Sequence, residues 1–186
     1  FLINENRVFS NNLTTLKDKN KNIYKAQNFR YFINEKIFRG KNLNILTNEN
    51  DKIFFNDGIV NLVSKEVVGK DLKANFNKQF SDNNLNNGLN EPRLKGNSGF
   101  SNEDKTIVKK GAFTTCKSRD DKCPPWVIEA SEIEHDKNKK IVFYKDAWLK
   151  LYNVPVLYYP RFFHPDPTVE RQTGFLKPGT SQSKEL

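Results

Sequence analysis

Sulfur and imidazole side chains are scarce in this sequence. It has no methionine, and its 186 residues include two cysteines and two histidines. Two cysteines are too few for a disulfide-rich scaffold, and Cys116 and Cys123 leave three states open: free thiols, one bridge, or one end each of two bridges. Their C-x6-C spacing does not match the tight pairs of zinc ribbons. With only His135 and His164 to add, we predict no metal site.

Long apolar runs and helical periodicity are also missing. No stretch is long and apolar enough to predict a transmembrane helix, and no window repeats apolar residues at i, i+3, i+4 and i+7 for three turns. A compact α-helical domain is therefore disfavoured. The chain starts at Phe1 without a signal-peptide pattern and ends in SKEL, which departs from the retention tetrapeptide, so we expect a mature or excised piece with a truncated end.

Catalytic signatures are missing as well. The sequence holds no P-loop, GxGxxG, GxSxG or HExxH motif. The neighbours His135 and Asp136 are not expected to act as a pair, because adjacent residues on a strand point to opposite faces and HDKNKK has the composition of a charged turn. Glu129, Glu132 and Glu134 are predicted to form an outer strand face. We therefore predict no catalytic residues, no cofactor and no enzyme.

Positive charge is abundant, with a formal net charge of +9. The lysines are spread along the chain, which is typical of a solvated outer face. The alternative is attraction to an anionic partner, either nucleic acid or a phosphorylated lipid headgroup. Nucleic-acid binding would require basic residues interleaved with exposed aromatic residues, and no local stretch has this composition. We predict no nucleic-acid partner.

Short alternating runs of Ile, Val, Phe and Tyr, broken by Asn, Asp and Gly, indicate β-strands and turns. A layout of two strands and a polar turn recurs in residues 22–46, in 66–76 resuming at 105–115, and in 126–152, with a further returning strand at 52–63. Such repetition predicts stacked units that bury one face against each other. Residues 81–104, rich in Asn, Gly and Ser, are predicted to form a long surface loop inserted in the second unit.

Strict alternation along these strands assigns one apolar face and one polar face. We therefore predict an all-β fold, a β-jelly roll or open antiparallel sandwich of repeated strand pairs with two facing sheets. The residues predicted to line its interior are Leu43, Ile45, Val68, Leu72, Ala74, Phe76, Trp126, Ile128, Ala130, Ile141, Phe143 and Leu149.

The C-terminal part carries a specific likeness. The stretches TTCKSRDDKCPPWVIEASEIEHD and KDAWLKLYNVPVLYYPRFFHPDPTVERQTGFLKP resemble the LPS-assembly protein family LptD, where its periplasmic domain joins its outer-membrane barrel. The likeness is densest over residues 113–178, where VPV-x-Y-x-P precedes R-x-[ST]-GFL-x-P. The N-terminal repeats alone would equally fit the related periplasmic proteins of the same transport bridge.

This resemblance implies a division of the chain. Residues 1–152 would form a periplasmic jelly roll that holds lipid acyl chains in its apolar interior, 153–172 a Pro-rich connector, and 173–186 the first strand of a truncated barrel. Because proline lacks a backbone N–H, the connector is predicted to be rigid and unpaired. The predicted connector and gate residues are Pro155, Pro160, Pro165, Pro167, Gly174 and Pro178.

The function implied is transport and assembly of lipopolysaccharide at the outer membrane of a Gram-negative cell, with this segment facing the periplasm. The implied partners are lipopolysaccharide, a periplasmic bridge protein of similar jelly-roll fold and an outer-membrane lipoprotein plug. The alternative is a non-enzymatic β-scaffold or bridge component, similar to LptA or LptC, that acts through edge-strand docking.

Three finer expectations follow from the resemblance. The strands near Phe1–Val8 and Ile23–Phe32 form the docking edge. The basic residues that would meet headgroup phosphates are Lys25, Arg30, Arg39 and Lys41. Cys116 bridges either to a cysteine in the absent barrel or locally to Cys123, and either bridge needs an oxidising compartment.

Overall fold

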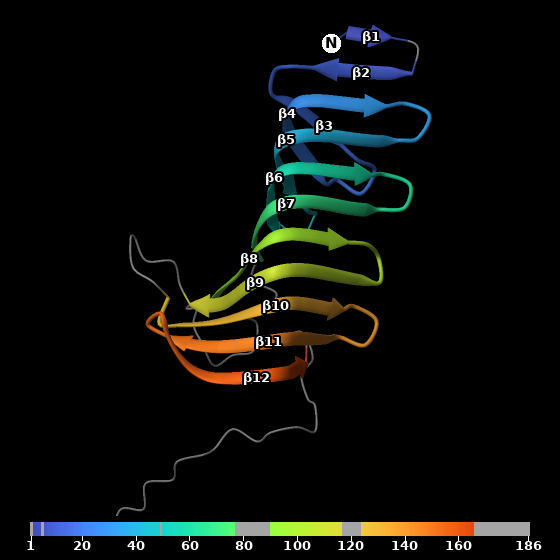
Figure 1. The fold of residues 1–186 in the computed structure, drawn as a ribbon. Coiled ribbons are helices and arrows are strands. Elements are labelled where there is room, and N and C mark those ends of the chain that lie inside the picture. The colour runs from blue at the N-terminus through green and yellow to red at the C-terminus, as the bar shows by residue number, and fades with distance from the viewer. Residues whose placement is uncertain (1, 5, 49, 77–89, 117–123, 166–186) are drawn as a thin grey trace, which may run out of the picture.

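The computed structural model describes residues 2–4, 6–48, 50–76, 90–116 and 124–165. It confirms the all-β prediction, since the described residues contain no helix and form one 12-stranded antiparallel sheet (Figure 1). The strands are β1 (Leu2–Asn4), β2 (Arg7–Ser10), β3 (Thr14–Lys17), β4 (Ile23–Phe32), β5 (Ile37–Leu46), β6 (Lys52–Asn61), β7 (Glu66–Asn75), β8 (Asn90–Ser101), β9 (Lys105–Cys116), β10 (Trp126–Asp136), β11 (Ile141–Leu151) and β12 (Val154–Pro165). They follow one another across the sheet in chain order, except that β2 and β3 both pair with β4.

The long strands do not alternate strictly from end to end. In β4 the inward-facing Ala26 and Phe29 are separated by two exposed residues, Gln27 and Asn28. The same inward–outward–outward–inward tetrad occurs once in each strand from β4 to β11. In chain order the tetrads are AQNF (26–29), GKNL (40–43), FNDG (55–58), GKDL (69–72), GNSG (96–99), VKKG (108–111), ASEI (130–133) and YKDA (144–147).

The backbone explains how a strand can change face in its middle. Five of these strands have a left-handed residue within or next to the tetrad: Asn28 at φ 48°, Asn42 at 48°, Asp71 at 53°, Lys110 at 48° and Asp146 at 50°. A left-handed residue inside a strand bends it and shifts the side-chain alternation by one, as in a β-bulge. Asn and Asp tolerate this conformation better than most residues.

Together the tetrads form a crease across the sheet, so the two facing layers are two arms of a single sheet. The first arm holds the strand halves that lead to the hairpin turns at 33–36, 62–65, 102–104 and 137–140. The second arm holds the opposite halves. The hairpin turns of the first arm stack along one side of the molecule (Figure 1).

The core lies between the arms. Its largest fully buried side chains are Phe38, Leu43, Val60 and Val108. The rings of Tyr24 on the second arm and Phe38 on the first arm lie 5.2 Å apart, centroid to centroid. The crease itself is filled, because a Cβ atom added at Gly58 would lie 2.4 Å from Leu43 Cδ2. Only glycine fits where the opposing side chain approaches this closely.

Backbone hydrogen bonds also link neighbouring hairpin turns. Leu62 N–H donates to Lys36 O at 3.0 Å, and Lys137 N–H donates to Asp104 O at 2.9 Å. Asn138 Nδ2 adds a 3.1 Å bond to Asp104 Oδ1. Hydrogen bonds between turns therefore stabilise the outer margin of the first arm, in addition to the hydrogen bonds between its strands.

The predicted loop at 81–104 is wrong over residues 90–101, which form β8. This strand inserts between β7 and β9, with Gly69 opposite Gly99 and Gly99 opposite Val108. The predicted pairing of 66–76 with 105–115 is wrong for the same reason, because β8 separates the two strands. Within the predicted loop, residues 81–89 lie outside the described part of the chain.

The predicted unpaired path from residue 153 is wrong over 154–165. Strand β12 pairs with β11 along its whole length, from Val154 opposite Leu151 to Pro165 opposite Ile141. Its prolines are compatible with pairing because β12 has no partner on its other side within the described sheet, and edge strands accept proline. The remaining residues of the predicted connector, 166–172, lie outside the described residues.

Candidate functional site

The apolar interior between the arms contains most of the residues predicted to line it. Leu43, Ile45, Leu72, Ala74 and Ala130 are buried in the core. Phe76 and Ile128 are half-buried and pack against that core. Trp126 and Leu149 are also half-buried, and the Trp126 ring lies 6.3 Å from the ring of Phe113, centroid to centroid.

Three predicted interior residues lie on the outer face instead. Val68 and Phe143 are 46% and 39% exposed. Each belongs to a strand whose alternation reverses at its tetrad, so Val68 faces away from Leu72, and Phe143 away from Ala147. Ile141 shares the outer face with Phe143, because the two residues are two positions apart on a strand.

The prediction from strict alternation did not include the residues that occupy the interior instead of these three. Val108, Ile133 and Tyr144 are buried, and the residues are 1%, 4% and 3% exposed. They lie opposite one another in register across β9, β10 and β11. The signal that would have identified them is the repeated tetrad, in which two consecutive polar residues stand between inward-facing ones.

The interior ends in half-buried apolar rims, away from the filled crease. These residues pack against the core and keep part of their surface accessible. On the first arm they are Tyr31, Leu62, Val67, Val142 and Phe162, and on the second arm Leu16, Ile53, Phe76, Phe113 and Ile128. Chemically, this arrangement can shelter an apolar chain between two apolar margins if the arms separate.

At the β12 end, rings close the interior. His164 on the first arm lies against Phe113 on the second, with ring centroids 6.5 Å apart. Tyr144 Oη and His164 Nε2 are hydrogen-bonded at 3.0 Å. Burial raises the pKa of the Tyr144 hydroxyl well above its usual range, so the ring stays neutral. Phe162 completes the group, 5.6 Å from the Tyr144 ring.

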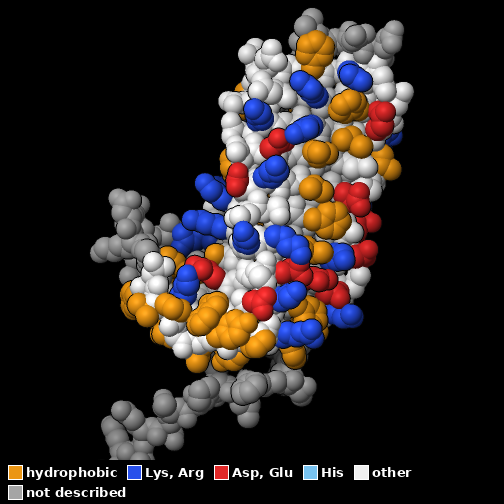
Figure 2. Space-filling model, in the orientation of Figure 1, with side chains coloured by type: hydrophobic (Ala, Val, Ile, Leu, Met, Phe, Trp, Pro, Cys, Tyr) orange, Lys and Arg blue, Asp and Glu red, His pale blue; other side chains and the backbone are white. Residues whose placement is uncertain are grey.

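The same end exposes an unusual amount of apolar surface. Nine large apolar residues of β11, β12 and the turn between them are between 43% and 74% exposed, and apolar side chains gather at the β12 end of the molecule (Figure 2). They are Trp148, Leu151, Tyr152, Val154, Val156, Leu157, Tyr158, Tyr159 and Phe163. An apolar patch this continuous on one edge typically marks an interaction surface.

The three described gate residues, Pro155, Pro160 and Pro165, all lie on β12 and are exposed. Of the other gate residues, Pro167, Gly174 and Pro178 lie outside the described residues. The gate role therefore stays a prediction.

The opposite edge of the sheet is β1, which pairs only with β2 among the described strands. The first part of the predicted docking edge, Phe1–Val8, therefore contains the edge strand, although Phe1 itself is outside the described residues. The second part, Ile23–Phe32, is not an edge. Strand β4 is covered by β2 and β3 on one side and by β5 on the other.

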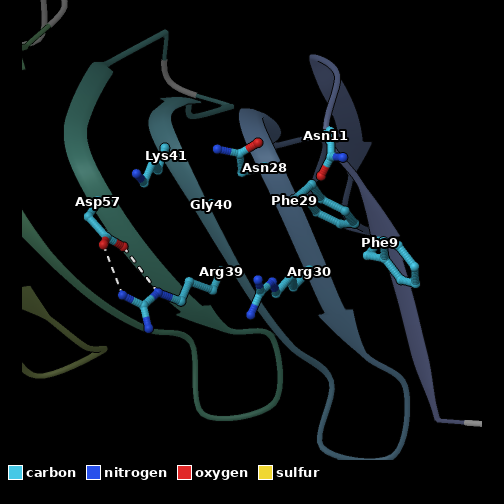
Figure 3. Close-up of a pocket in the computed structure, with 9 residues that line it drawn as sticks. All are labelled: Phe9, Asn11, Asn28, Phe29, Arg30, Arg39, Gly40, Lys41 and Asp57. Atoms are coloured by element: carbon cyan, nitrogen blue, oxygen red, sulfur yellow. Dashed lines mark hydrogen bonds and ion pairs between the residues drawn. The ribbon is translucent and has the colours of Figure 1, made fainter. Parts of the chain in front are cut away.

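A basic cleft lies on the outer face of β4, β5 and β6, next to the crease. Its volume is about 610 Å³, and it contains three of the four predicted phosphate-binding cations, Arg30, Arg39 and Lys41 (Figure 3). Lys25 does not line it. The complete lining is Phe9, Asn11, Asn28, Phe29, Arg30, Arg39, Gly40, Lys41 and Asp57.

One carboxylate sits among these cations. Arg39 Nε donates to Asp57 Oδ1 at 3.2 Å and Arg39 Nη2 to Asp57 Oδ2 at 2.9 Å, which is a bidentate pair. The hydrogen bonds from Arg39 lower the pKa of the Asp57 carboxyl below its usual range, and the charges of Arg39, Lys41 and Lys70 lower it further. Sequence reasoning missed Phe9, Asn28 and Asp57, because only strand register brings them beside the arginines.

The remaining polar candidates have structural roles. Glu129 and Glu132 form ion pairs with Lys150 and Lys109 on the outer face, as their predicted position requires. Asp136 Oδ1 accepts a 2.9 Å hydrogen bond from Lys139 N–H in the turn predicted at HDKNKK. No group of acidic, histidine and cysteine side chains within the described ranges is arranged to hold a metal ion.

Two further predictions concern the cysteines and membrane helices. Cys116 is half-buried at the end of β9 and forms no disulfide with another described residue, while Cys123 lies outside the described residues. Both proposed bridges therefore stay predictions. In the part of the chain that the structure describes, no helix has the length and hydropathy to cross a membrane.

Comparison with known proteins finds similar sequences among the LPS-assembly proteins LptD. No family model matches the chain. The LPS-assembly protein LptD of Aeromonas hydrophila subsp. hydrophila is 31% identical over 147 residues, which cover 72% of this chain and 16% of that protein. LptD of Nitrosomonas eutropha is 33% identical over 100 residues, 48% of this chain and 13% of that protein. LptD of Yersinia pseudotuberculosis serotype I is 37% identical over 73 residues, 39% of this chain and 9% of that protein. The chain thus spans less than a fifth of these relatives.

Proposed function

Because this chain is LptD-like over most of its length, we propose that it takes part in lipopolysaccharide assembly at the outer membrane of a Gram-negative cell, with the folded sheet in the periplasm. The observation that carries the proposal is the apolar interior, which runs from β4 to β12 between two half-buried rims. It supports a non-enzymatic transport role, in which the protein moves a lipid without changing it.

In this proposal the acyl chains lie between the arms at the level of the rims. The crease stays packed, since Gly58 and Leu43 leave no room there. Entry then requires the arms to separate at their margins while the crease acts as the hinge. Each methylene that leaves water contributes about 0.8 kcal/mol, so the rims favour acyl chains over the sugar headgroup.

Lipid would pass along the sheet from the β1 edge toward the β12 edge, where release requires the ring group that closes the interior to open. A bridge protein of similar fold would add a strand to β1, because an edge strand offers unpaired N–H and C=O groups to a partner. The apolar surface around β12 would face the next part of the path, in the remainder of an LptD-like protein. A lipoprotein plug belongs to this proposal only through the family resemblance.

Photocrosslinking at single positions tests the lipid path. A photoreactive residue at Phe76 or Ile128 on the inner rim should form adducts with lipopolysaccharide in cells. The same residue at Val68 or Ile59, which are apolar but outward-facing, should form none. These control positions are also apolar, so a difference in adduct yield would show that lipid lies in the interior and does not adsorb nonspecifically to apolar surface.

Two outcomes would contradict the proposal. Equal adducts at all four positions would mean that lipid contacts the surface without selection. No adducts at any position, with the β-sheet circular dichroism unchanged, would overturn the lipid path and leave edge-strand docking of a protein partner as the function.

A further inference from the structure

A row of apolar side chains crosses the outer face of the first arm from β6 to β12. Each member lies opposite the next in register, except that Glu134 on β10 stands between the fourth and the fifth. Four of the six are between 39% and 65% exposed. A continuous apolar surface on a face that should carry polar residues typically marks an interaction site. We call this row the apolar stripe, and its members are Ile59, Val68, Phe100, Ile107, Phe143 and Phe163.

A mainly basic row runs beside the apolar stripe, on the side of the crease. From β6 to β12 its members are, in register, Asp57, Lys70, Ser98, Lys109, Glu132, Lys145 and Arg161. Its two carboxylates are already paired, Asp57 with Arg39 and Glu132 with Lys109. Lys70, Lys145 and Arg161 form no ion pair with a carboxylate in the described part of the chain. This margin therefore favours a partner that presents acidic side chains to it.

One acidic residue interrupts the apolar stripe. Glu134 lies between Ile107 and Phe143 in register and is half-buried. Among the described residues it has no ion-pair partner. A partner that covered the stripe would remove water from this carboxylate, and a buried charge without a partner is costly. The occupant must therefore bring a basic side chain to Glu134.

A second copy of this chain does not meet these requirements. Two copies that pack face to face around a twofold axis must share one self-complementary surface. An axis along the stripe places the Glu134 side chains of the two copies opposite each other. An axis across the stripe, centred on β9, places Lys70 of one copy opposite Lys145 of the other. Both arrangements bring like charges together, so the occupant is a different protein.

The dimensions of the stripe indicate the form of that protein. A strand cannot be added there, because β6 to β11 are each paired on both sides. The stripe is one row wide and is bordered by charge, which matches the narrow apolar face of an amphipathic helix. Its strand-to-strand steps of about 4.8 Å give a length of about 29 Å, which a helix of about 19 residues spans. On such a helix, the basic residue at Glu134 would lie about 13 residues from the end at Ile59.

We propose that the apolar stripe binds an amphipathic α-helix of another protein, with a Lys or Arg at Glu134 and acidic residues along the basic row. The stripe is on the outer face, whereas the lipid path of the proposed function runs between the arms. The inference therefore does not rest on that path, and failure of one does not imply failure of the other.

A synthetic helix tests the proposal with the full chain. The probe is a fluorescently labelled peptide of about 19 residues, with Leu on its apolar face, one Lys at the position that meets Glu134, and Glu on the flank that faces the basic row. Fluorescence anisotropy should show saturable binding. Val68→Glu should weaken this binding at least tenfold. The matched control is Leu13→Glu, which places the same charge at an exposed apolar residue outside the stripe and should change affinity less than twofold.

A charge reversal tests the contact at Glu134. Glu134→Lys should weaken binding of the Lys-containing peptide at least tenfold. A second peptide, with Glu in place of that Lys, should bind Glu134→Lys within about threefold of the original affinity. This recovery would also show that the variant is folded. A third peptide, with Lys in place of the Glu residues on its flank, should bind the unmodified chain at least tenfold more weakly, because it faces the basic row with like charge.

Four results would overturn the proposal. No saturable binding of the first peptide would refute the docking surface. An equal loss of affinity in Leu13→Glu would show that the peptide responds to the net charge of the chain and not to the stripe. No recovery in the charge reversal would refute the contact at Glu134. In cells, a photoreactive residue at Val68 should form an adduct with a helical segment of another protein that carries a basic residue, and adducts only with lipid or with a second copy of the chain would refute the choice of occupant.

Discussion

The contact between Gly58 and Leu43 allows the closed crease to be tested by a double-mutant cycle. A methyl group added at Gly58 would lie 2.4 Å from Leu43 Cδ2 and 3.3 Å from Leu43 Cβ. Leu43 is fully buried, so it has no free space into which to move. Gly58→Ala should therefore cost about 1–3 kcal/mol of unfolding free energy through overpacking. Leu43→Ala should cost about 2–5 kcal/mol through the lost side chain and the cavity it leaves.

The double variant should be less destabilised than the sum of the two. Once Leu43 is shortened, the nearest remaining atom to the new methyl group is its Cβ, and the methyl fills part of the cavity. We expect a favourable coupling of about 1–2 kcal/mol, within the range for residues in contact. Urea unfolding followed by circular dichroism would measure it. As a control, Gly58→Ala combined with Val108→Ala should be additive, because β6 and β9 are about 14 Å apart across the sheet. Additive effects in the Leu43 pair would refute the packed crease.

Three further predictions use other parts of the fold. Asp71→Val should destabilise the chain by about 1–2 kcal/mol in urea unfolding, because Asp71 has a φ of 53°, while Asp71→Gly should be nearly neutral; equal losses would contradict the left-handed crease. The pKa of Asp57 is lowered by Arg39, so this pair adds stability above the ordinary carboxyl range and loses it as pH falls below about 4. Asp57→Asn should reduce the loss of unfolding free energy below about pH 4, measured by urea unfolding at several pH values. An unchanged pH dependence would show that solvent fully screens the pair. Lys137→Met should cost about 1–2 kcal/mol in the same assay, because the Lys137 amine donates to Asn102 O between two turns; no loss would mean that water replaces this bond.

The all-β class was predictable because most strands alternate over the four or five residues on each side of the crease. Leu72 and Ala74, or Ala147 and Leu149, share a face, as period-two reasoning requires. The error arises at the tetrad. A single left-handed residue such as Asp71 reverses the pattern beyond it, so Val68 was assigned to the wrong face. Local composition does not show the dihedral angle, and only comparison of all the tetrads reveals the repeat.

Strand β8 was not predictable from its own residues. Pro92, Gly96 and Gly99 are residues that weaken a strand, and they make its composition resemble a loop. It is held by partners on both sides, with Leu72 of β7 opposite Gly96. The glycines are required there, since a Cβ atom at Gly99 would lie 2.8 Å from Leu72 Cδ2. The neighbouring strands thus override the low strand propensity of the sequence.

The basic cleft escaped prediction for a different reason. Its cations were identified from the sequence, but Asp57 and Phe9 come from strands on either side of β4 and β5. Charge pairing across strands depends on register, and register depends on the bulges at Gln27 in the β4–β5 ladder. Residue type alone therefore gave the sign of the charge and not its arrangement.

The repeated tetrad also sets the width of the interior. Every strand from β4 to β11 crosses the crease with the same four-residue step, so the cross-section between the arms is set by the tetrad and not by the number of strands. Each added strand lengthens the interior by about 4.8 Å. A hairpin gained or lost would then change the length of the passage by about 9.6 Å without altering its width. Under the proposed lipid path, chains built on this plan would span different distances while they hold acyl chains of the same width.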